Sequence, residues 1–174
     1  MPELIRPTAA LHLAFLDSRD EWGRGVHEDG AGLRIEDDVD TAEGFATWVR
    51  RLTDQEDVTK PIDEGFVHCT YRWMVEDGRF LGAIALRHEL NDFLLNTGGH
   101  IGYGVRPSAR RRGLATWALS LMLTEARRLR MPRVLITCQV ANVPSARTIE
   151  RAGGVLEDIR GKGEDEVRRY WITL

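Results

Sequence analysis

An arginine-rich turn with a single glycine is the segment of this sequence best suited to chemistry. Residues 110–115 read Arg-Arg-Arg-Gly-Leu-Ala and stand directly before an amphipathic stretch. The first turn of a helix leaves backbone N–H groups without partners, and the helix dipole adds partial positive charge. Glycine lets a ligand approach the backbone closely, and the arginines add further charge. The segment therefore predicts a cradle for a pyrophosphate, and hence a ligand that carries phosphate.

The residues expected to form this cradle lie in the turn or in the first helical turn after it. They are Arg110, Arg111, Arg112, Gly113, Leu114, Ala115 and Thr116. The alternative is an exposed basic helix start that binds nothing. An apolar run ending at Val105 on one side, and the pattern Asn142-x-x-Ser145 on the other, favour the ligand site.

Regular elements on both sides would hold the turn in place. Residues 100–105 read as a strand, and an apolar stripe at helical spacing follows from Leu114 to Leu129. A buried strand at 134–138 and a short helix at 144–152 come next, and two glycines end that helix. The chain then closes with a hairpin of strands at 155–160 and 167–173.

The first part of the chain predicts two helices and then a hairpin. Helices are expected at residues 11–22 and 41–52, the second capped by Thr41, with loops at 23–32 and 54–64. Strands at 66–75 and 79–86 flank Glu76-Asp77-Gly78, a tight-turn signal. The order of elements indicates a mixed α/β layout around one twisted sheet.

The composition is that of an ordinary soluble domain. At 174 residues, with 43% apolar and 29% charged residues, one domain is expected. The net charge of −3 argues against a general nucleic-acid binder. The two cysteines imply neither a disulfide framework nor a metal site, and no signal peptide or membrane-spanning run is apparent, so we expect a cytoplasmic protein.

These motifs together resemble the GNAT superfamily of acetyl-CoA-dependent N-acetyltransferases. Arg110-x-x-Gly113-x-Ala115 is similar to the superfamily pattern Gln/Arg-x-x-Gly-x-Gly/Ala, and Asn142-x-x-Ser145 is similar to Asn-x-x-Ser/Ala on its second core helix. The strings Arg-His-Glu-Leu-Asn at 87–91 and Gly-Gly-His-Ile-Gly-Tyr at 98–103 resemble an uncharacterised subgroup of predicted acetyltransferases. The element order agrees over residues 65–174.

The resemblance implies a single GNAT-like domain over residues 1–174, of the α/β (mixed α+β) class. Its central twisted sheet would be mostly antiparallel, with helices on both faces. Residues 65–174 would form the acetyl-CoA-binding core, and residues 1–64 the variable part that faces the substrate. Acetyl-CoA would be the acetyl donor and a primary amine of a small molecule or peptide the acceptor, without metal, nucleic acid or membrane.

The resemblance also implies roles for residues beside the turn. Val105 would donate its backbone N–H to the thioester oxygen, with Tyr103 and Gly104 nearby. Gly102 and Gly104 within one short strand indicate either a bulge or a closely approaching ligand. Asn142 and Ser145 would bond the pantetheine arm or cap the short helix.

The acid and base of the superfamily have no direct counterparts here. The position of its usual glutamate aligns with Gly99, so His88, Glu89 and His100 are the candidate bases, and a water chain is a further alternative. The position of its usual tyrosine holds Ile149, and Tyr103 or a water could take that role.

Three functions follow from the sequence. The first is acetylation of a primary amine by direct transfer from acetyl-CoA. The second is a non-catalytic acyl-CoA-binding or regulatory domain of the same fold. The third, which the net charge disfavours, is a nucleic-acid-binding module using the arginines of 106–112 and 127–133.

The terminal hairpin offers an edge through which a homodimer could form. Large aromatic residues could line an acceptor cleft, although a place in the core is favoured; they are Phe15, Trp22, Phe45, Trp48 and Trp73.

Overall fold

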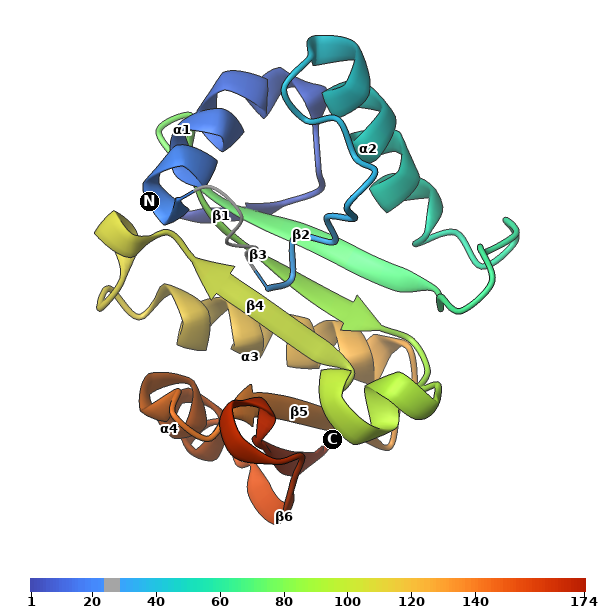
Figure 1. Ribbon diagram of the computed structural model, residues 1–174, viewed down its shortest axis with the longest axis vertical. Coiled ribbons are helices and arrows are strands. Elements are labelled where there is room, and N and C mark those ends of the chain that lie inside the picture. Colours follow the sequence, from blue (N-terminus) through green and yellow to red (C-terminus); the bar gives the residue numbers. More distant parts are fainter. Residues whose placement is uncertain (24–28) are drawn as a thin grey trace.

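The computed structural model describes residues 1–23 and 29–174, which fold around one seven-stranded sheet (Figure 1). The strand order is β1-β2-β3-β4-β5-β7-β6, and every neighbouring pair is antiparallel except β4 and β5. The sheet is therefore mostly antiparallel, as expected. The strands are β1 (Glu3–Ile5), β2 (Cys69–Glu76), β3 (Arg79–Arg87), β4 (Ile101–Val105), β5 (Arg133–Gln139), β6 (Val155–Arg160) and β7 (Val167–Thr173).

In the described part of the chain, four α-helices and several short helical turns connect the strands. Thr41 caps α2 by accepting a hydrogen bond from the N–H of Gly44 at 3.1 Å, as its sequence position predicted. The α-helices are α1 (His12–Trp22), α2 (Ala42–Asp54), α3 (Leu114–Arg128) and α4 (Val143–Arg151). The short turns are 3-10 segments at Ala9–Leu11, Pro107–Ala109 and Gly163–Asp165 and a π-helical segment at Leu94–Gly98. Among the described residues, no helix is both long enough and apolar enough to span a membrane.

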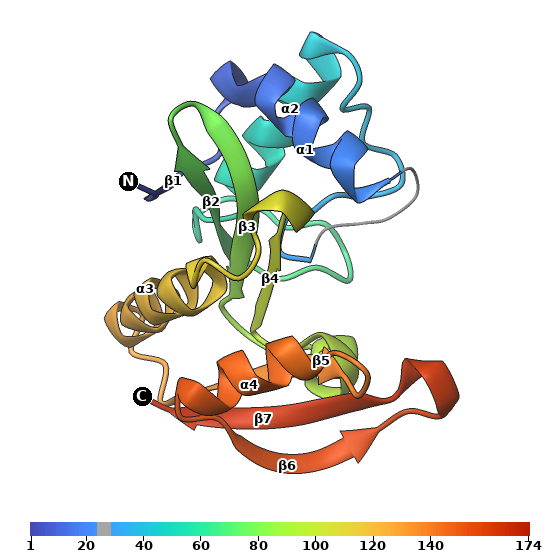
Figure 2. The same ribbon diagram turned by 90° about the vertical axis from the view of Figure 1, so that its left-hand side faces the viewer.

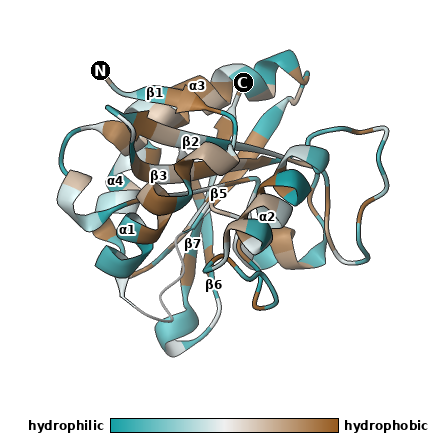
Figure 3. Cartoon of the chain, turned by 90° about the horizontal axis from the view of Figure 1, so that it is seen from above, coloured by the Kyte–Doolittle hydropathy of each residue, from teal (hydrophilic) through white to brown (hydrophobic). Residues whose placement is uncertain are grey.

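Each face of the sheet has its own core. One core packs α1 and α2 against β2 and β3, and the other packs α3 and α4 against the strands from the opposite side (Figure 2). Successive residues of a strand point to opposite faces, so Trp73 belongs to the first core and Met74 to the second. Figure 3 shows hydrophobic residues gathered on the strands and on the helical surfaces that face them.

The large aromatic residues fill the core under α1 and α2 rather than an acceptor cleft. Four of those singled out in the sequence are at most 2% exposed, namely Phe15, Phe45, Trp48 and Trp73. Their rings pack on one another, with Trp48 and Trp73 stacked at a centroid distance of 5.6 Å. Trp22 is half-buried at the end of α1.

The sheet is split between β4 and β5. The parallel ladder between them consists of one pair, Ile101 with Ile136, whereas β5 and β7 pair along their whole length. Beyond this pair the two strands diverge, and Figure 2 shows β5, β7 and β6 running at a steep angle to β4. Within residues 1–23 and 29–174, the C-terminal half of β4 thus lacks a neighbouring strand on its β5 side.

The glycines of β4 do not mark a bulge. Residues 101–105 stay in register with β3, and the irregularity in this part of the sheet falls between β2 and β3, where Met74 pairs with Gly82 and Val75 with Phe80. Of the two alternatives drawn from the sequence, the bulge is therefore wrong. The approach of a ligand stays a prediction, and the backbone N of Gly30 lies 3.6 Å from where a Cβ on Gly102 would stand. The neighbour is the protein's own loop.

Several elements were not expected from the sequence, among them β1, the π-helical segment and the 3-10 segment at Pro107–Ala109. β1 has only three residues, too few for an alternating pattern to stand out, and it pairs with β2 at the edge of the sheet. The π-helical segment at Leu94–Gly98 interrupts the connection between β3 and β4. Its fold depends on tertiary contacts, including a hydrogen bond from Thr137 Oγ1 on β5 to the carbonyl of Thr97 at 2.5 Å.

Candidate functional site

The basic turn leads from β4 into α3, as the sequence predicted. Arg111 and Gly113 both adopt left-handed backbone conformations, with φ of 61° and 78°. The first hydrogen bond of α3 runs from the N–H of Trp117 to the carbonyl of Gly113 at 2.9 Å, so the N–H groups of residues 114–116 have no partner within the helix. A Cβ on Gly113 would meet no atom within 4 Å. The turn is therefore an open set of backbone donors at the positive end of a helix.

The three arginines of the turn have different surroundings. Arg110 donates from Nε to the carbonyl of Val105 at 3.1 Å, and its guanidinium lies 4.8 Å from the ring centroid of Trp22. Arg112 forms an ion pair with Glu76 on β2 at 2.6 Å. Arg111 is exposed and has no side-chain partner within the described part of the chain. Arg111 is thus the guanidinium most available to an anion at the turn.

Backbone donors of β4 face the gap beside it. Hydrogen-bonded and non-hydrogen-bonded pairs alternate along an antiparallel ladder. The N–H of Arg106 bonds the carbonyl of Leu81, and the N–H of Arg87 bonds the carbonyl of His100, so even-numbered residues of β4 bond β3. The N–H groups of Tyr103 and Val105 consequently point away from β3, into the gap left by the divergence of β5. The N–H of Gly104 points toward β3.

Tyr103 and Ser145 meet across this gap. The hydroxyl of Tyr103 on β4 lies 2.9 Å from that of Ser145 on α4. Burial raises the pKa of Tyr103 to about 12, and its hydrogen bond to Ser145 opposes the rise. The phenol therefore keeps its proton at neutral pH. Asn142 caps α4 by accepting a hydrogen bond from the N–H of Ser145 at 3.2 Å, which is the capping role weighed in the sequence.

The position at which the superfamily carries its tyrosine holds Ile149 here, which cannot donate a proton. Ile149 is fully buried in the core between α4 and the sheet. Its side chain also crowds Gly154, where a Cβ would come within 2.6 Å of an Ile149 methyl carbon. A tyrosine would not fit at this place without a shift of the chain, so any proton donor must come from another element.

His100 is a structural link rather than a free base. Its ring Nδ1 accepts a hydrogen bond from the backbone N–H of Leu135 at 2.8 Å. The backbone N–H of His100 donates to the carbonyl of Leu135 at 2.7 Å. Burial, with the positive charges of Arg87 and Arg133, lowers the pKa of His100 to about 4. The neutral imidazole ties the start of β4 to β5, on the closed side of the split. It lies outside the group of residues that face the gap.

His88 and Glu89 lie beyond the end of β3, away from the basic turn. The register that pairs Leu86 with Ile101 places His88 level with Gly99, roughly 13 Å along the strand from Tyr103 at 3.3 Å per residue. His88 Nε2 is 2.9 Å from the hydroxyl of Thr70, and burial lowers its pKa. Glu89 is exposed and has no hydrogen-bonded partner in the described residues. The structure does not bring either side chain to the gap.

Two charged residues near the gap escaped the sequence analysis. Arg87 reaches from β3 across β4, donating to the carbonyls of Gly98 and Gly99 at 3.1 and 3.2 Å. Its Nη1 would lie 3.5 Å from a Cβ on Gly102. Asp29 lies on the loop that crosses β4 at the same level. The clue in the sequence is Gly30 and Gly102, two positions without side chains that let the loop and the strand approach closely.

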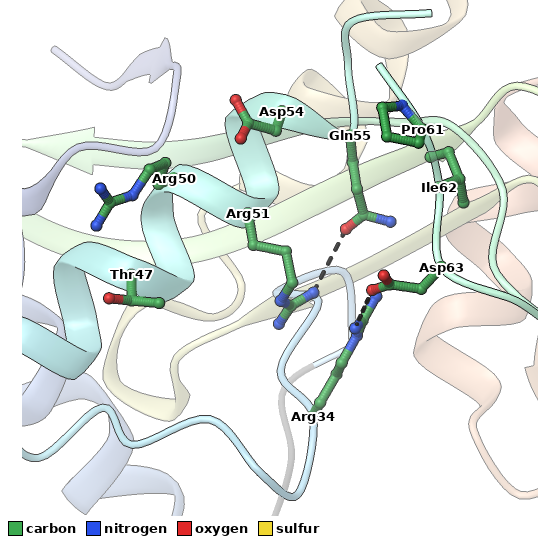
Figure 4. A pocket seen from close by; sticks show the side chains of 9 residues that line it. All are labelled: Arg34, Thr47, Arg50, Arg51, Asp54, Gln55, Pro61, Ile62 and Asp63. Carbon is green, nitrogen blue, oxygen red and sulfur yellow. Dashed lines mark hydrogen bonds and ion pairs between the residues drawn. The ribbon is translucent and has the colours of Figure 1, made fainter.

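A hollow of about 330 Å³ lies elsewhere, between α2 and the loop that follows it. Figure 4 shows that two of its arginines are already paired, Arg34 with Asp63 and Arg51 with Gln55. Arg51 also contacts Asp37. No residue of the basic turn or of β4 lines this hollow, so it does not belong to the candidate site. The described residues contain no group of three or more histidine, cysteine, aspartate or glutamate side chains that could hold a metal ion.

One of the arginines proposed for nucleic-acid binding, Arg106, does not lie on the surface. Arg106 is only 3% exposed and pairs with Asp17 at 2.8 Å and Glu21 at 2.5 Å, both on α1. Its Nη1 also donates to the carbonyl of Phe80 at 3.2 Å. Arg106 therefore fastens α1 to the sheet and is withdrawn from any nucleic acid.

Comparisons with known proteins agree with this fold. A family model described as "Acetyltransferase (GNAT) domain" matches residues 26–155, which includes part of the segment expected to be variable. RimL, a ribosomal L7/L12 alpha-N-protein acetyltransferase solved in complex with coenzyme A, has a TM-score of 0.70 at 17% identity, over 99% of this chain and 94% of that one. No curated protein sequence matches the chain.

Two further solved structures, both from Salmonella typhimurium, share the fold. One is an acetyl transferase that modifies the N-terminal serine of 50S ribosomal subunit protein L7/L12, with a TM-score of 0.66 and 16% identity over 99% of this chain and 95% of that one. The other is yncA, a putative acetyltransferase with acetyl-CoA, with a TM-score of 0.64 and 13% identity over 99% and 93%. At these identities the likeness concerns the fold alone.

Proposed function

The chain belongs to the GNAT acetyltransferase family, and from this premise we propose that it transfers an acetyl group from acetyl-CoA to a primary amine. The observation that carries the proposal is the continuity of the gap beside β4 with the basic turn. Backbone donors of Tyr103 and Val105 face the gap, and those of residues 114–116 lie where it reaches α3. Two sets of donors at the two ends of one path suit a long ligand with a phosphate group at one end.

The residues at the turn fit the pyrophosphate of acetyl-CoA. The open space around Gly113 leaves room for phosphate oxygens against the backbone, and the exposed Arg111 can supply a guanidinium. Arg110 and Arg112 are held by protein partners, so their contribution is mainly to the local field. The side chain of Leu114 is buried, so this residue can contact the pyrophosphate only through its backbone N–H. Proteins of the same fold solved with acetyl-CoA support this assignment.

When bound, acetyl-CoA supplies an activated acetyl group as its thioester. The N–H groups of Tyr103 and Val105 are then placed to stabilise negative charge on the carbonyl oxygen, because they are fixed donors without a partner strand. The hydroxyl of Tyr103 can donate its proton to the departing sulfur, and Ser145 can pass a proton back to Tyr103. Tyr103 thus takes the place left open by Ile149.

The acceptor is proposed only as an amine. Two of the proteins with this fold are described as acting on ribosomal protein L7/L12, one of them on its N-terminal serine. These descriptions make peptides with a free α-amino group the first acceptors to try. A free α-amino group has a pKa of about 8 and a lysine side chain about 10.4, so the α-amine is more often neutral and nucleophilic at pH 7.

A non-catalytic acyl-CoA-binding domain is the competing function. The buried Ile149 and the remote positions of His88, Glu89 and His100 are what favour it. Calorimetry with acetyl-CoA, followed by an assay of CoA-thiol release over amines, amino acids, polyamines and peptides, separates the two. Binding with turnover supports the enzyme. Binding without turnover on the whole panel would support the competing function, and no binding would refute both.

A further inference from the structure

The backbone at Gly30, between α1 and α2, lies directly over the centre of β4. A Cβ on Gly30 would come within 2.4 Å of the carbonyl oxygen of Gly102 and 3.0 Å of that of Ala83. Gly30 has a φ of 80° and is buried, so the loop backbone presses against the strands where side chains are absent. Figures 1 and 2 both show the blue segment after the grey trace running beside β4. Asp29, which precedes Gly30, is therefore held at the level of Gly102.

Burial and the charge of Arg87 on β3 act on the carboxylate of Asp29, which in turn acts on Tyr103 of β4. Arg87 on β3 has its Nη1 3.5 Å from the place of a Cβ on Gly102, and its charge lowers the pKa of Asp29. Burial has the larger effect and raises that pKa, although the residue as a whole is exposed. On β4, the carboxylate in turn raises the pKa of Tyr103. Asp29 is thus accessible and is close enough to act on the phenol that faces the gap.

We propose that Asp29 is the proton acceptor of the transfer reaction, the role for which the superfamily position holds Gly99. The proposal rests on the proposed function. A neutral amine attacks the acetyl carbon; an N–C bond forms, the C–S bond breaks, and the sulfur leaves with the electron pair. Asp29 takes the proton that the nitrogen must lose, and the sulfur receives one from Tyr103. Asp29 then releases its proton to solvent, and Tyr103 recovers one through Ser145, so the products are an amide and a free thiol.

The position of Asp29 over β4 explains why the proton acceptor need not be a residue of β4 itself. Gly99 has a φ of 66°, and a Cβ there would come within 2.8 Å of the carbonyl oxygen of Leu135. A glutamate at that position would be strained and would clash with β5. Because Gly102 has no side chain, the backbone at Asp29 and Gly30 can occupy the space above the strand. The role of Arg87 is to keep the carboxylate ionised against the effect of burial.

The test uses the whole chain and a peptide or amine turned over by the wild-type protein. We expect Asp29→Asn to lower kcat about 10²- to 10⁴-fold, the usual contribution of a general base, and to abolish the rise of kcat/KM with pH. The affinity for acetyl-CoA, measured by calorimetry, should stay within about twofold. Asp29→Glu should recover part of the rate because it restores a carboxylate. Glu36→Gln, which changes an exposed carboxylate elsewhere in the N-terminal part, is the matched control and should behave as wild type.

A second measurement does not depend on turnover. The carboxyl carbon of Asp29, assigned in ¹³C NMR spectra by comparison with Asp29→Asn, should titrate above the ordinary aspartate pKa of about 3.9. A kcat of Asp29→Asn equal to wild type, or loss of the pH-dependent rise in Glu89→Gln instead, would refute the role of Asp29 and leave the proposed function intact. A raised KM with an unchanged kcat and pH profile would also refute it, since it would make Asp29 an anchor for the acceptor. A wild-type protein without turnover would refute both proposals.

Discussion

The hydroxyl of Tyr103 on β4 and that of Ser145 on α4 lie 2.9 Å apart and join the two halves of a split sheet. β4 and β5 share one ladder pair, so this contact is among the few polar links across the gap. It places a protonated phenol beside the backbone donors of β4. The same link can therefore serve both to hold α4 against the first half of the sheet and to supply a proton.

Tyr103→Phe separates these two roles. We expect kcat to fall about tenfold to a hundredfold, at the low end for a general acid because a thiol with a pKa of about 8.5 leaves readily. The loss of one hydrogen bond should cost only about 1 kcal/mol of unfolding free energy. Steady-state kinetics with urea denaturation of the same preparations checks both values. A lower stability with an unchanged kcat would mean that Tyr103 only holds α4 in place.

Gly113→Glu tests the cradle at the basic turn. The added side chain meets no protein atom, but it places bulk and negative charge where phosphate oxygens are proposed to lie, so acetyl-CoA affinity should fall at least about a hundredfold. The positive φ adds a strain of roughly 1–2 kcal/mol. Gly65→Glu is the matched control, because Gly65 also has a positive φ and open space but lies in the loop before β2. Calorimetry should show normal affinity for the control, and equal losses in both would contradict the cradle.

Local patterns carried most of the prediction from sequence. The basic turn, the Thr41 cap and the Asn142 cap depend on residues within one turn of each other, and all are present. The contacts that define the site are not local. Tyr103 and Ser145 are 42 residues apart, and the loop at Gly30 meets Gly102 only because α1 and α2 fold back over the sheet.

Charge alone also misled the sequence interpretation at Arg106. Next to three exposed arginines it belongs by composition to a basic surface, yet it is buried under α1. The partners that neutralise it, Asp17 and Glu21, stand more than eighty residues earlier in the chain. Nothing in the neighbouring sequence distinguishes an arginine that finds such partners from one that remains in solvent.

Replacement by alanine should therefore affect stability at Arg106 and acetyl-CoA binding at Arg111. Arg106→Ala leaves Glu21 without its guanidinium and should lower the unfolding free energy by about 3 kcal/mol, the lower end for a buried pair because Asp17 and Glu21 reach water. Arg111→Ala should leave stability within about 0.5 kcal/mol and weaken acetyl-CoA binding. Urea denaturation and calorimetry on both variants measure the two effects. A stable Arg106→Ala protein would contradict the structural role given to that residue.

His100 should make the protein sensitive to acid. Its pKa is about 4 in the folded chain and about 6.5 when unfolded, so between these values the unfolded state binds a proton that the folded state does not. Stability is thus fully present above pH 6.5 and is lost as the pH falls toward 4, by up to about 3 kcal/mol for the buried imidazole.

His100→Asn isolates this contribution. The amide oxygen of asparagine can accept the N–H of Leu135 as Nδ1 of the imidazole does, but it does not titrate in this range. We expect the difference in unfolding free energy between pH 7 and pH 4.5 to be about 2–3 kcal/mol smaller in the variant than in wild type. Urea denaturation followed by tryptophan fluorescence at the two pH values measures it. His88, whose pKa is also lowered, is present in both proteins, so its effect cancels. An equal pH dependence in the two proteins would show that the folded chain does not lower the pKa of His100, and would contradict the role given to its link to β5.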